Sequence, residues 1–248
     1  MAKSSGLGQQ FYIAGYDLSG DVGSLSGVGS PRQLLEITSI NKSAVERLNG
    51  RSDASLSFNT FFNDAAAQEH AALSGLPTAD RLVLWGFFGA TGDAACAFPA
   101  KQMNYDGSRG ADGSLAFSVD VVADGIASDW CELLTDGKVT HSSAGSSTSR
   151  DDGAATSAGL VAHLLIVTAA SGTPTVTIQQ SSDNGVSDAW ATLASFTAVG
   201  YASTPTAERI TVSGAVERYL RVTTTGTFSN AQFVVATRRG TAQDDVTL

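Results

Sequence analysis

Alternation of apolar and polar residues is the clearest pattern along this chain, and it is strongest in residues 54–61 and 114–123. Successive side chains of a β-strand point to opposite faces, so this period of two predicts strands with one buried face. The other face carries short polar side chains, namely Ser55, Ser57 and Asn59 in the first segment and Ser114, Ser118 and Asp120 in the second. Monomers usually cover an exposed sheet with longer Lys and Glu side chains. Two interpretations therefore fit this face equally well. It could be a smooth surface that lies beside a bulky partner, or an ordinary solvent-exposed sheet face.

The first half of the chain is predicted to be an antiparallel β-sandwich or barrel with one packed helix. Strands are expected near residues 9–17, 33–39, 54–61, 81–88, 94–104, 114–123 and 130–138. Asp106-Gly107 and Asp112-Gly113 favour a hairpin that joins the fifth and sixth of these strands. Asn63 or Asp64 is expected to cap the helix, which ends near Gly75.

Two stretches between the predicted strands of the first half are expected to be long loops. Residues 19–32 are rich in glycine and serine, and residues 40–53 are mainly polar. The glycine-rich stretch lacks a lysine and a following helix, so it does not fit a phosphate-binding loop. Long loops of this kind often become ordered only on assembly.

A Ser/Gly/Thr-rich segment divides the chain, which predicts three regions: a domain over 1–141, a flexible linker over 142–157 and a β-sandwich domain over 158–248. Six strands are expected in the second domain, near residues 160–169, 174–181, 190–197, 208–213, 217–224 and 231–238. Asp183-Asn184-Gly185 predicts a tight turn. The large apolar residues expected to form its core include Trp190, Phe196, Tyr219 and Phe233.

Charge is unevenly distributed, and its sign argues against nucleic-acid recognition. The 248 residues carry a net charge of −9. Residues 1–141 hold 9 Lys/Arg and 16 Asp/Glu, a net −7, so most of the acidity lies in the first half. An acidic surface repels phosphate backbones, which disfavours sequence-reading DNA binding. The start of the sequence has no apolar signal-peptide core, and no apolar run is long enough to cross a bilayer, so a soluble protein without membrane insertion is expected.

No arrangement of residues points to catalysis, a metal or a cofactor. The three histidines lie far apart in different contexts, and no nucleophile elbow or dinucleotide fingerprint is present. The acidic pairs lack the aromatic platform that a sugar-cleaving site would use, so solvated charge is the favoured interpretation. Cys96 and Cys131 are expected to be buried free thiols rather than a disulfide scaffold. A non-enzymatic role without cofactors is therefore expected.

The order of elements in residues 9–138 resembles the major tail (tail tube) proteins of long, non-contractile-tailed bacteriophages. The matching features are Asp17-Leu18-Ser19-Gly20, a strand ending at Thr38, an excursion containing Asn49-Gly50-Arg51, the strand 54–61 and the helix after it. The second half is similar to the β-sandwich appendages that some such phages fuse to this subunit. The residues of that match are Asp183-Asn184-Gly185, Trp190 and 218–222.

The resemblance implies a virion protein, made in the host bacterial cytoplasm, that forms six-membered rings stacked into a tube for genome delivery. It implies tape-measure, tail terminator and tail tip proteins as partners, and double-stranded DNA that passes without specific binding. The face predicted to line the lumen comprises Glu36, Asp53, Ser55, Ser57, Asn59, Ser114, Ser118 and Asp120. Ring stacking is assigned to the two loops, with Asp21, Leu25, Asn41, Lys42, Arg47 and Arg51 as contact residues.

Other functions also fit the sequence. Weak binding of host-surface glycans by the second half, strengthened by many copies, is one alternative, and a purely decorative role is favoured over it. A carbohydrate-binding protein with two β domains is a rival from another class, and the scarcity of clustered Trp and Tyr counts against it. A tail terminator or a head decoration protein is a further alternative among virion components.

Overall fold

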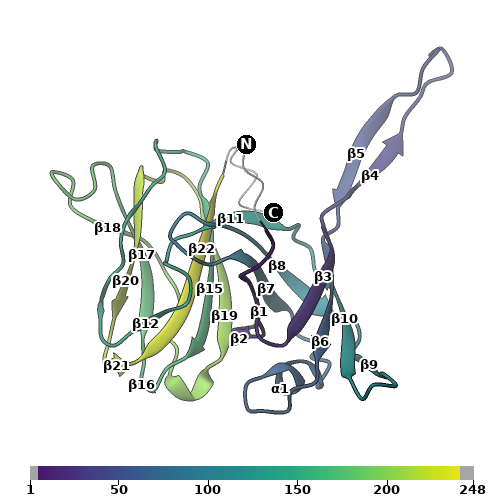
Figure 1. The fold of residues 1–248 in the computed structure, drawn as a ribbon. Coiled ribbons are helices and arrows are strands. Elements are labelled where there is room, and N and C mark those ends of the chain that lie inside the picture. Colours follow the sequence, from purple (N-terminus) through teal and green to yellow (C-terminus); the bar gives the residue numbers. More distant parts are fainter. Residues whose placement is uncertain (1–4, 241–248) are drawn as a thin grey trace.

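The computed structural model describes residues 5–240 and is a mainly β protein (Figure 1). About 53% of the described residues are in strands and 3% in helices, which confirms the predicted fold class. The largest sheet follows the order β19-β15-β22-β11-β8-β10-β6-β3, with β1, β2, β7, β9 and β12 attached beside this path. All of its paired strands are antiparallel.

The seven strands predicted in the first half occur close to their expected positions, and β3, β5 and β9 lie where loops or a turn were expected. The strands of this half are β1 (Gln9–Ile13), β2 (Tyr16–Asp17), β3 (Val22–Gly29), β4 (Arg32–Glu36), β5 (Arg47–Ser52), β6 (Ser55–Phe61), β7 (Arg81–Phe87), β8 (Ala94–Gln102), β9 (Asp106–Arg109), β10 (Leu115–Ala123) and β11 (Asp129–Leu133). The strands β3, β6 and β10 pack against β1, β7 and β8 around one apolar core that contains Phe11, Phe58 and Phe98. Burial of such side chains stabilises the fold by roughly 25 cal/mol per Å² of apolar surface.

The second half is a β-sandwich. Its strands are β12 (Val139–His141), β13 (Gly145–Ser146), β14 (Arg150–Asp151), β15 (Leu160–Thr168), β16 (Ser171–Gly172), β17 (Thr175–Ser181), β18 (Ala191–Ser195), β19 (Thr206–Val212), β20 (Tyr219–Thr225), β21 (Phe228–Ser229) and β22 (Ala231–Arg239), with a 3-10 turn η1 (Tyr201–Ser203). β15 and β22 lie in the large sheet, and β17 and β20 form the facing sheet. The core between the two sheets includes Ile166, Ile178 and Phe233.

The two halves share one sheet instead of being joined by a flexible linker. β11 from the first half pairs with β22 from the second, with Leu133 opposite Ala236. A third apolar core, containing Tyr12, Leu84 and Leu165, is built from both halves. The predicted linker 142–157 contains β13 and β14, and both pair with β20. Independent folding of residues 1–141 and 158–248 stays a prediction.

Buried arginine explains why the Ser/Gly-rich composition did not produce a flexible linker. Arg150 lies in this segment and is 7% exposed. Its guanidinium donates to the main-chain oxygens of Glu132 and Leu133 at 3.0 and 3.2 Å and to Asp152 at 2.6 Å. Charge-assisted hydrogen bonds of this kind are stronger than neutral ones, so one long side chain fixes a segment that otherwise buries little.

A second charged cluster lies between the halves, around the carboxylate of Asp129 on β11. It accepts hydrogen bonds from Arg238 on β22 at 2.8 Å and from His163 on β15, whose Nε2 lies 3.1 Å away. Arg209 Nε on β19 is 3.6 Å from the same group. Burial alone would raise the pKa of Asp129, yet that pKa lies below its ordinary value because His163 and the two arginines surround the carboxylate. Burial lowers the pKa of His163 from its ordinary value, although the hydrogen bond to Asp129 acts in the opposite direction.

The helix is shorter than predicted. The described residues contain one α-helix, α1 (Glu69–Leu73), at the lower edge of the body in Figure 1. Asn63 and Asp64 do not cap it: Gln68 occupies that position, and Ala67 has a φ of 60° that no α-helix can accommodate. The Asn63 side chain instead accepts from Ala65 N at 3.1 Å and donates to Asp21 at 2.8 Å.

Candidate functional site: an assembly surface

Two segments predicted to be loops are strands, and together they build the most unusual part of the molecule. Residues 22–29 form β3, which pairs with β6 while Val22, Leu25 and Val28 pack against the first-half core. Residues 47–52 form β5, which pairs with β4. The sequence pattern of β3 was too rich in Gly and Ser to indicate a strand.

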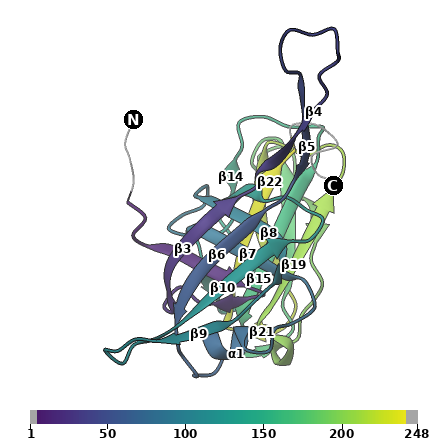
Figure 2. The same cartoon turned by 90° about the vertical axis from the view of Figure 1, so that its right-hand side faces the viewer.

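The hairpin β4–β5, called the arm below (residues 32–52), extends away from the body (Figures 1 and 2). It continues the β3–β6 pair beyond Ser30 and Ser52, whose hydroxyl groups lie 2.7 Å apart at its base. Leu35 lies opposite Leu48, and both are about half exposed at 48% and 53%. Other large apolar side chains exposed on the arm are Leu34, Ile37, Ile40 and Val45. An isolated two-stranded hairpin is at best marginally stable in water, so this arm presents an apolar surface with no core beneath it.

The predicted lumen residues come together only in part. Ser57 lies opposite Asp120, Asn59 opposite Ser118 and Ser55 opposite Val122, so these five polar residues share one face of the β6–β10 pair. Ser24 and Ser26 of β3 extend that face across the next strand. We call this surface the polar wall, and it comprises Ser24, Ser26, Ser55, Ser57, Asn59, Ser118 and Asp120. Ser114 lies instead in the β9–β10 turn, Glu36 on the arm and Asp53 just after the arm.

Side chains of the polar wall hydrogen-bond to one another. The Ser57 hydroxyl donates to Asp120, and Asn59 Nδ2 donates to Ser24 Oγ at 3.3 Å. Asn104 Nδ2 donates to Asp120 at 3.1 Å and to Asp106 at 2.9 Å. The wall is therefore a face of short polar side chains with one carboxylate, Asp120, and its polar groups bond to one another.

A basic group at the margin of the wall, Lys101, is paired with two carboxylates. Lys101 lies opposite Val122, next to the wall. Its ammonium pairs with Asp80 and also with Asp124, 3.0 Å away. The wall itself contains one carboxylate, Asp120, and no Lys or Arg.

The predicted stacking residues fall into two groups. Asn41, Lys42, Arg47 and Arg51 lie on the exposed arm. Asp21 does not fit a contact role, because it is 7% exposed and accepts hydrogen bonds from Glu69 N and Asn63. Leu25 is half-buried against the first-half core. Asp21 and Leu25 therefore belong to the packing of the body.

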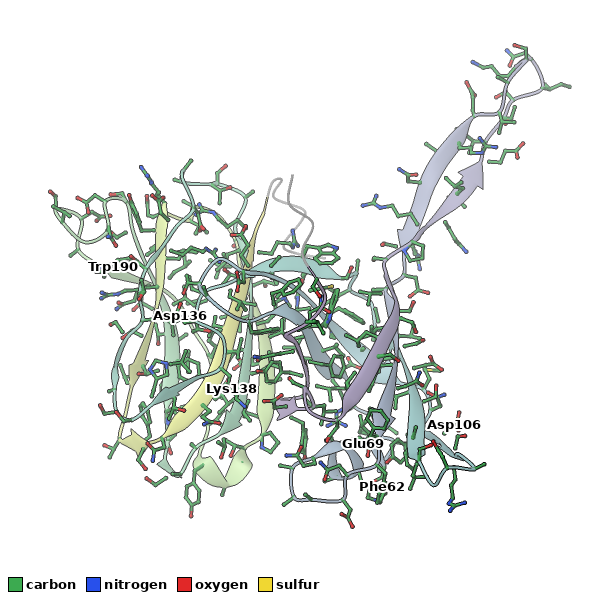
Figure 3. The ribbon with its side chains drawn as sticks, viewed as in Figure 1. Phe62, Glu69, Asp106, Asp136, Lys138 and Trp190 are labelled. Carbon is green, nitrogen blue, oxygen red and sulfur yellow. The ribbon has the colours of Figure 1, made fainter. Side chains whose placement is uncertain are left out.

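The second half offers little of the aromatic surface expected for a glycan site. Phe196 and Phe233 are buried in the sandwich core, 2% and 0% exposed. Trp190 is only half-buried, at the edge of the sandwich in Figure 3, and the guanidinium of Arg221 stacks 4.3 Å from its ring centroid. Tyr219 is also half-buried, beside Arg218. Trp190 and Tyr219 are thus edge residues and not the centre of the core.

Within residues 5–240, no group of three or more His, Cys, Asp or Glu side chains is arranged to hold a metal ion. No helix in that range has the length and apolar character needed to span a bilayer.

Cys96 and Cys131 are buried free thiols, as predicted. They lie on the neighbouring strands β8 and β11 but enter two different cores on opposite faces of the sheet. Burial raises the pKa of Cys96 to about 11 and that of Cys131 well above its ordinary value. Since the thiolate is the reactive form, both thiols should be inert at neutral pH.

We expect thiol-specific reagents at pH 8 to react with the native protein at least on the order of 100-fold more slowly than with the urea-unfolded chain. Absorbance of the released chromophore measures both rates. Rapid reaction of either cysteine in the native protein would contradict the buried placement.

Comparisons with known proteins give remote structural similarity only. No protein-family model matches the sequence, and no curated protein matches it. A chain from the tail of an empty GTA particle with C6 symmetry has a TM-score of 0.40 and 16% identity, over 50% of this chain and 97% of that chain. The Dit protein of SPP1, described as a paradigm of the hub adsorption apparatus in phages of Gram-positive bacteria, has a TM-score of 0.35 and 9% identity, over 93% and 99%. A chain of the phage p2 baseplate in its activated conformation has a TM-score of 0.37 and 9% identity, over 94% and 99%. All three TM-scores lie below 0.5, so these similarities carry no conclusion about function.

Proposed function

We propose that this protein is a structural subunit of a bacteriophage tail, which assembles into six-membered rings stacked as a tail tube for genome delivery. The observation that carries the proposal is the arm, since it exposes six large apolar side chains on a hairpin with no core of its own. Exposed apolar surface of this kind marks an interaction site. Identical neighbours complete such a surface in a repeating assembly.

The edge of the large sheet supports the same proposal. β3 ends the sheet order, and within residues 5–240 the only strand it pairs with is β6. A free edge presents unpaired N–H and C=O groups that a soluble monomer would have to protect. In the proposed ring, β3 pairs with a strand of the adjacent copy, and the sheets of all copies join around a central channel.

The polar wall is assigned to that channel. Its short polar side chains and the Asp120 carboxylate, with no basic residue among them, would repel DNA without binding it, over about a Debye length, roughly 8 Å at physiological salt. The partners that follow from this role are copies of this chain, a tape-measure protein inside the growing tube, and terminator and tip proteins at its ends. The second half would then decorate the outside, where weak glycan binding by many copies remains a separate proposal.

Electron microscopy of the purified protein at high concentration tests the assembly. The expected images show tubes of stacked rings with a DNA-wide channel. Single closed rings that never stack would indicate a ring-shaped hub instead of a tube. A protein that stays monomeric at every concentration would refute the proposal.

Cysteine labelling of assembled tubes tests the orientation of the polar wall. We expect Asn59→Cys and Ser118→Cys to react with a maleimide on a large polymer in the free protein, and to be protected from it in tubes. A small maleimide should still react through the channel. Ser187→Cys, on an exposed hairpin of the second half, is the matched control and should react with both reagents in both states. Equal labelling of the wall by the large reagent in tubes would place the wall outside.

A further inference from the structure

We propose that the arm of one copy docks on a patch at the opposite end of a second copy, formed by Phe61, Phe62 and Leu115. This far-end patch is the acceptor surface for the arm. The inference rests on the proposed stacking of copies, and it adds the surface on which the arm docks. The occupant is a second copy of this chain.

The far-end patch comprises three exposed apolar side chains at the adjoining ends of β6 and β10, with Phe61 on the side of the polar wall and Phe62 and Leu115 on the other side of the sheet. Phe61 is 57% exposed, Phe62 39% and Leu115 38%. Phe62 N donates to Leu115 O at 3.1 Å, so the ends of β6 and β10 lie side by side. The ring of Phe62 contacts that of Phe117, 5.9 Å between centroids, and Phe117 stacks on Tyr105 at 4.1 Å. Through Phe117 and Tyr105, the Phe62 side of the patch is connected to the first-half core.

The arm presents a matching apolar stripe. Leu35 and Leu48 are cross-strand neighbours, and Ile37 follows two residues after Leu35 on the same face. All three are about half exposed. Cross-strand apolar pairs are the unit by which hairpins are stabilised, but this pair lacks a layer beneath it. Contact with an aromatic patch would supply that layer.

Opposite charges favour the same pairing. The arm, residues 32–52, contains four Lys/Arg and two Asp/Glu, a net +2, so the rest of the chain carries −11. Residues 61–79 and 103–118, which surround the far-end patch, contain four Asp/Glu and one Arg, a net −3. Complementary potentials favour this orientation over arm-to-arm contact, in which two basic hairpins would meet.

The positions of the two surfaces suit a head-to-tail contact. The arm enters the body at the start of β6, and the far-end patch lies where β6 ends at Phe61. A strand of this length separates its ends by roughly 20 Å. Figure 3 shows Phe62 and Asp106 at the lower edge of the body, while the arm leaves from the upper edge. Contacts between unlike surfaces generate open stacks, which arm-to-arm contact does not.

Mixing two variants tests the docking directly. One carries Leu48→Cys on the arm and the other Leu115→Cys at the far-end patch, with an affinity tag to give a distinct mass. The native thiols are buried, so a short bismaleimide reports on the added ones. We expect crosslinked heterodimer in at least about tenfold excess over a mixture of Leu48→Cys with Ser187→Cys, because docking raises the effective concentration of the paired thiols.

A second acceptor variant keeps the test valid if Leu115→Cys fails to fold. Ala111→Cys lies in the exposed β9–β10 turn beside the patch and should crosslink to Leu48→Cys in the same way. If wild-type protein forms tubes but neither acceptor exceeds the Ser187→Cys control, the docking inference fails while the proposed function stands. Predominant Leu48→Cys homodimers would show arm-to-arm contact and also overturn it. If wild-type protein stays monomeric at all concentrations, the proposed function itself fails.

Discussion

Replacing Asp129 by asparagine is expected to destabilise the folded chain by about 3–5 kcal/mol, the usual cost of removing one member of a buried ionic cluster. The carboxylate accepts from His163 and Arg238 and lies 3.6 Å from Arg209 Nε. Asparagine has nearly the same shape, so packing is retained while the two guanidinium groups lose their shared carboxylate. For a chain of this size the loss corresponds to a drop in Tm on the order of 10 °C.

The pH dependence of this loss follows from the lowered pKa of Asp129. Because the folded-state pKa lies below the ordinary value near 4, the unfolded chain binds the proton first as pH falls. The stabilisation is therefore complete above about pH 5 and is lost as pH falls through the folded-state pKa. Thermal unfolding of wild type and Asp129→Asn should differ most near pH 7 and converge in acid.

Asp151→Asn is the matched control for Asp129→Asn. Asp151 pairs with Arg218 at 2.7 Å, but both side chains are 43% exposed. Exposed ion pairs contribute little to stability, so this variant should unfold almost like wild type. Equal effects of the two substitutions would contradict the role assigned to the buried cluster.

Deleting the arm is expected to abolish tube formation while leaving the body folded. Arg32 lies opposite Ser52, so replacing residues 33–51 by Asn-Gly closes the hairpin with a two-residue turn. The arm adds no side chain to the three apolar cores, and the Tm should therefore change by no more than about 2–4 °C. Sedimentation velocity measures assembly, and circular dichroism measures folding.

A point variant separates loss of the apolar stripe from loss of the whole arm. Leu35→Ser with Leu48→Ser keeps the hairpin length and should prevent assembly. Gln33→Ser with Asn49→Ser changes polar arm residues and should permit it. Tubes formed by the arm-deleted protein would show that stacking uses other surfaces.

Residue alternation predicted β6 and β10 because one face of each strand is buried with a period of two. Leu56 and Phe58 enter a core while Ser57 and Asn59 do not, and β10 repeats the pattern opposite them. The same alternation placed five of the eight proposed lumen residues on one face. The six predicted strands of the second half also occur, although β15 and β22 are buried on both faces and show no such alternation.

The remaining elements depend on contacts between distant residues. Gly107 looked like part of a turn, but it lies in β9, where a side chain would meet the ring of Phe117 at 2.7 Å. Gly23 in β3 likewise leaves room for Phe61, whose ring a side chain there would meet at 2.8 Å. Arg150 and Asp129 fasten the halves through partners far along the sequence. No local pattern contains that information.

The pairing of β11 with β22 has a mechanical consequence. A push or twist applied to either half passes to the other through main-chain hydrogen bonds and the buried ionic cluster, not through a loose tether. In a tube, the second half would have the same height and the same tilt relative to the tube on every subunit. The decoration would then form a regular lattice over the tail, and bending of the tail would change the spacing of that lattice.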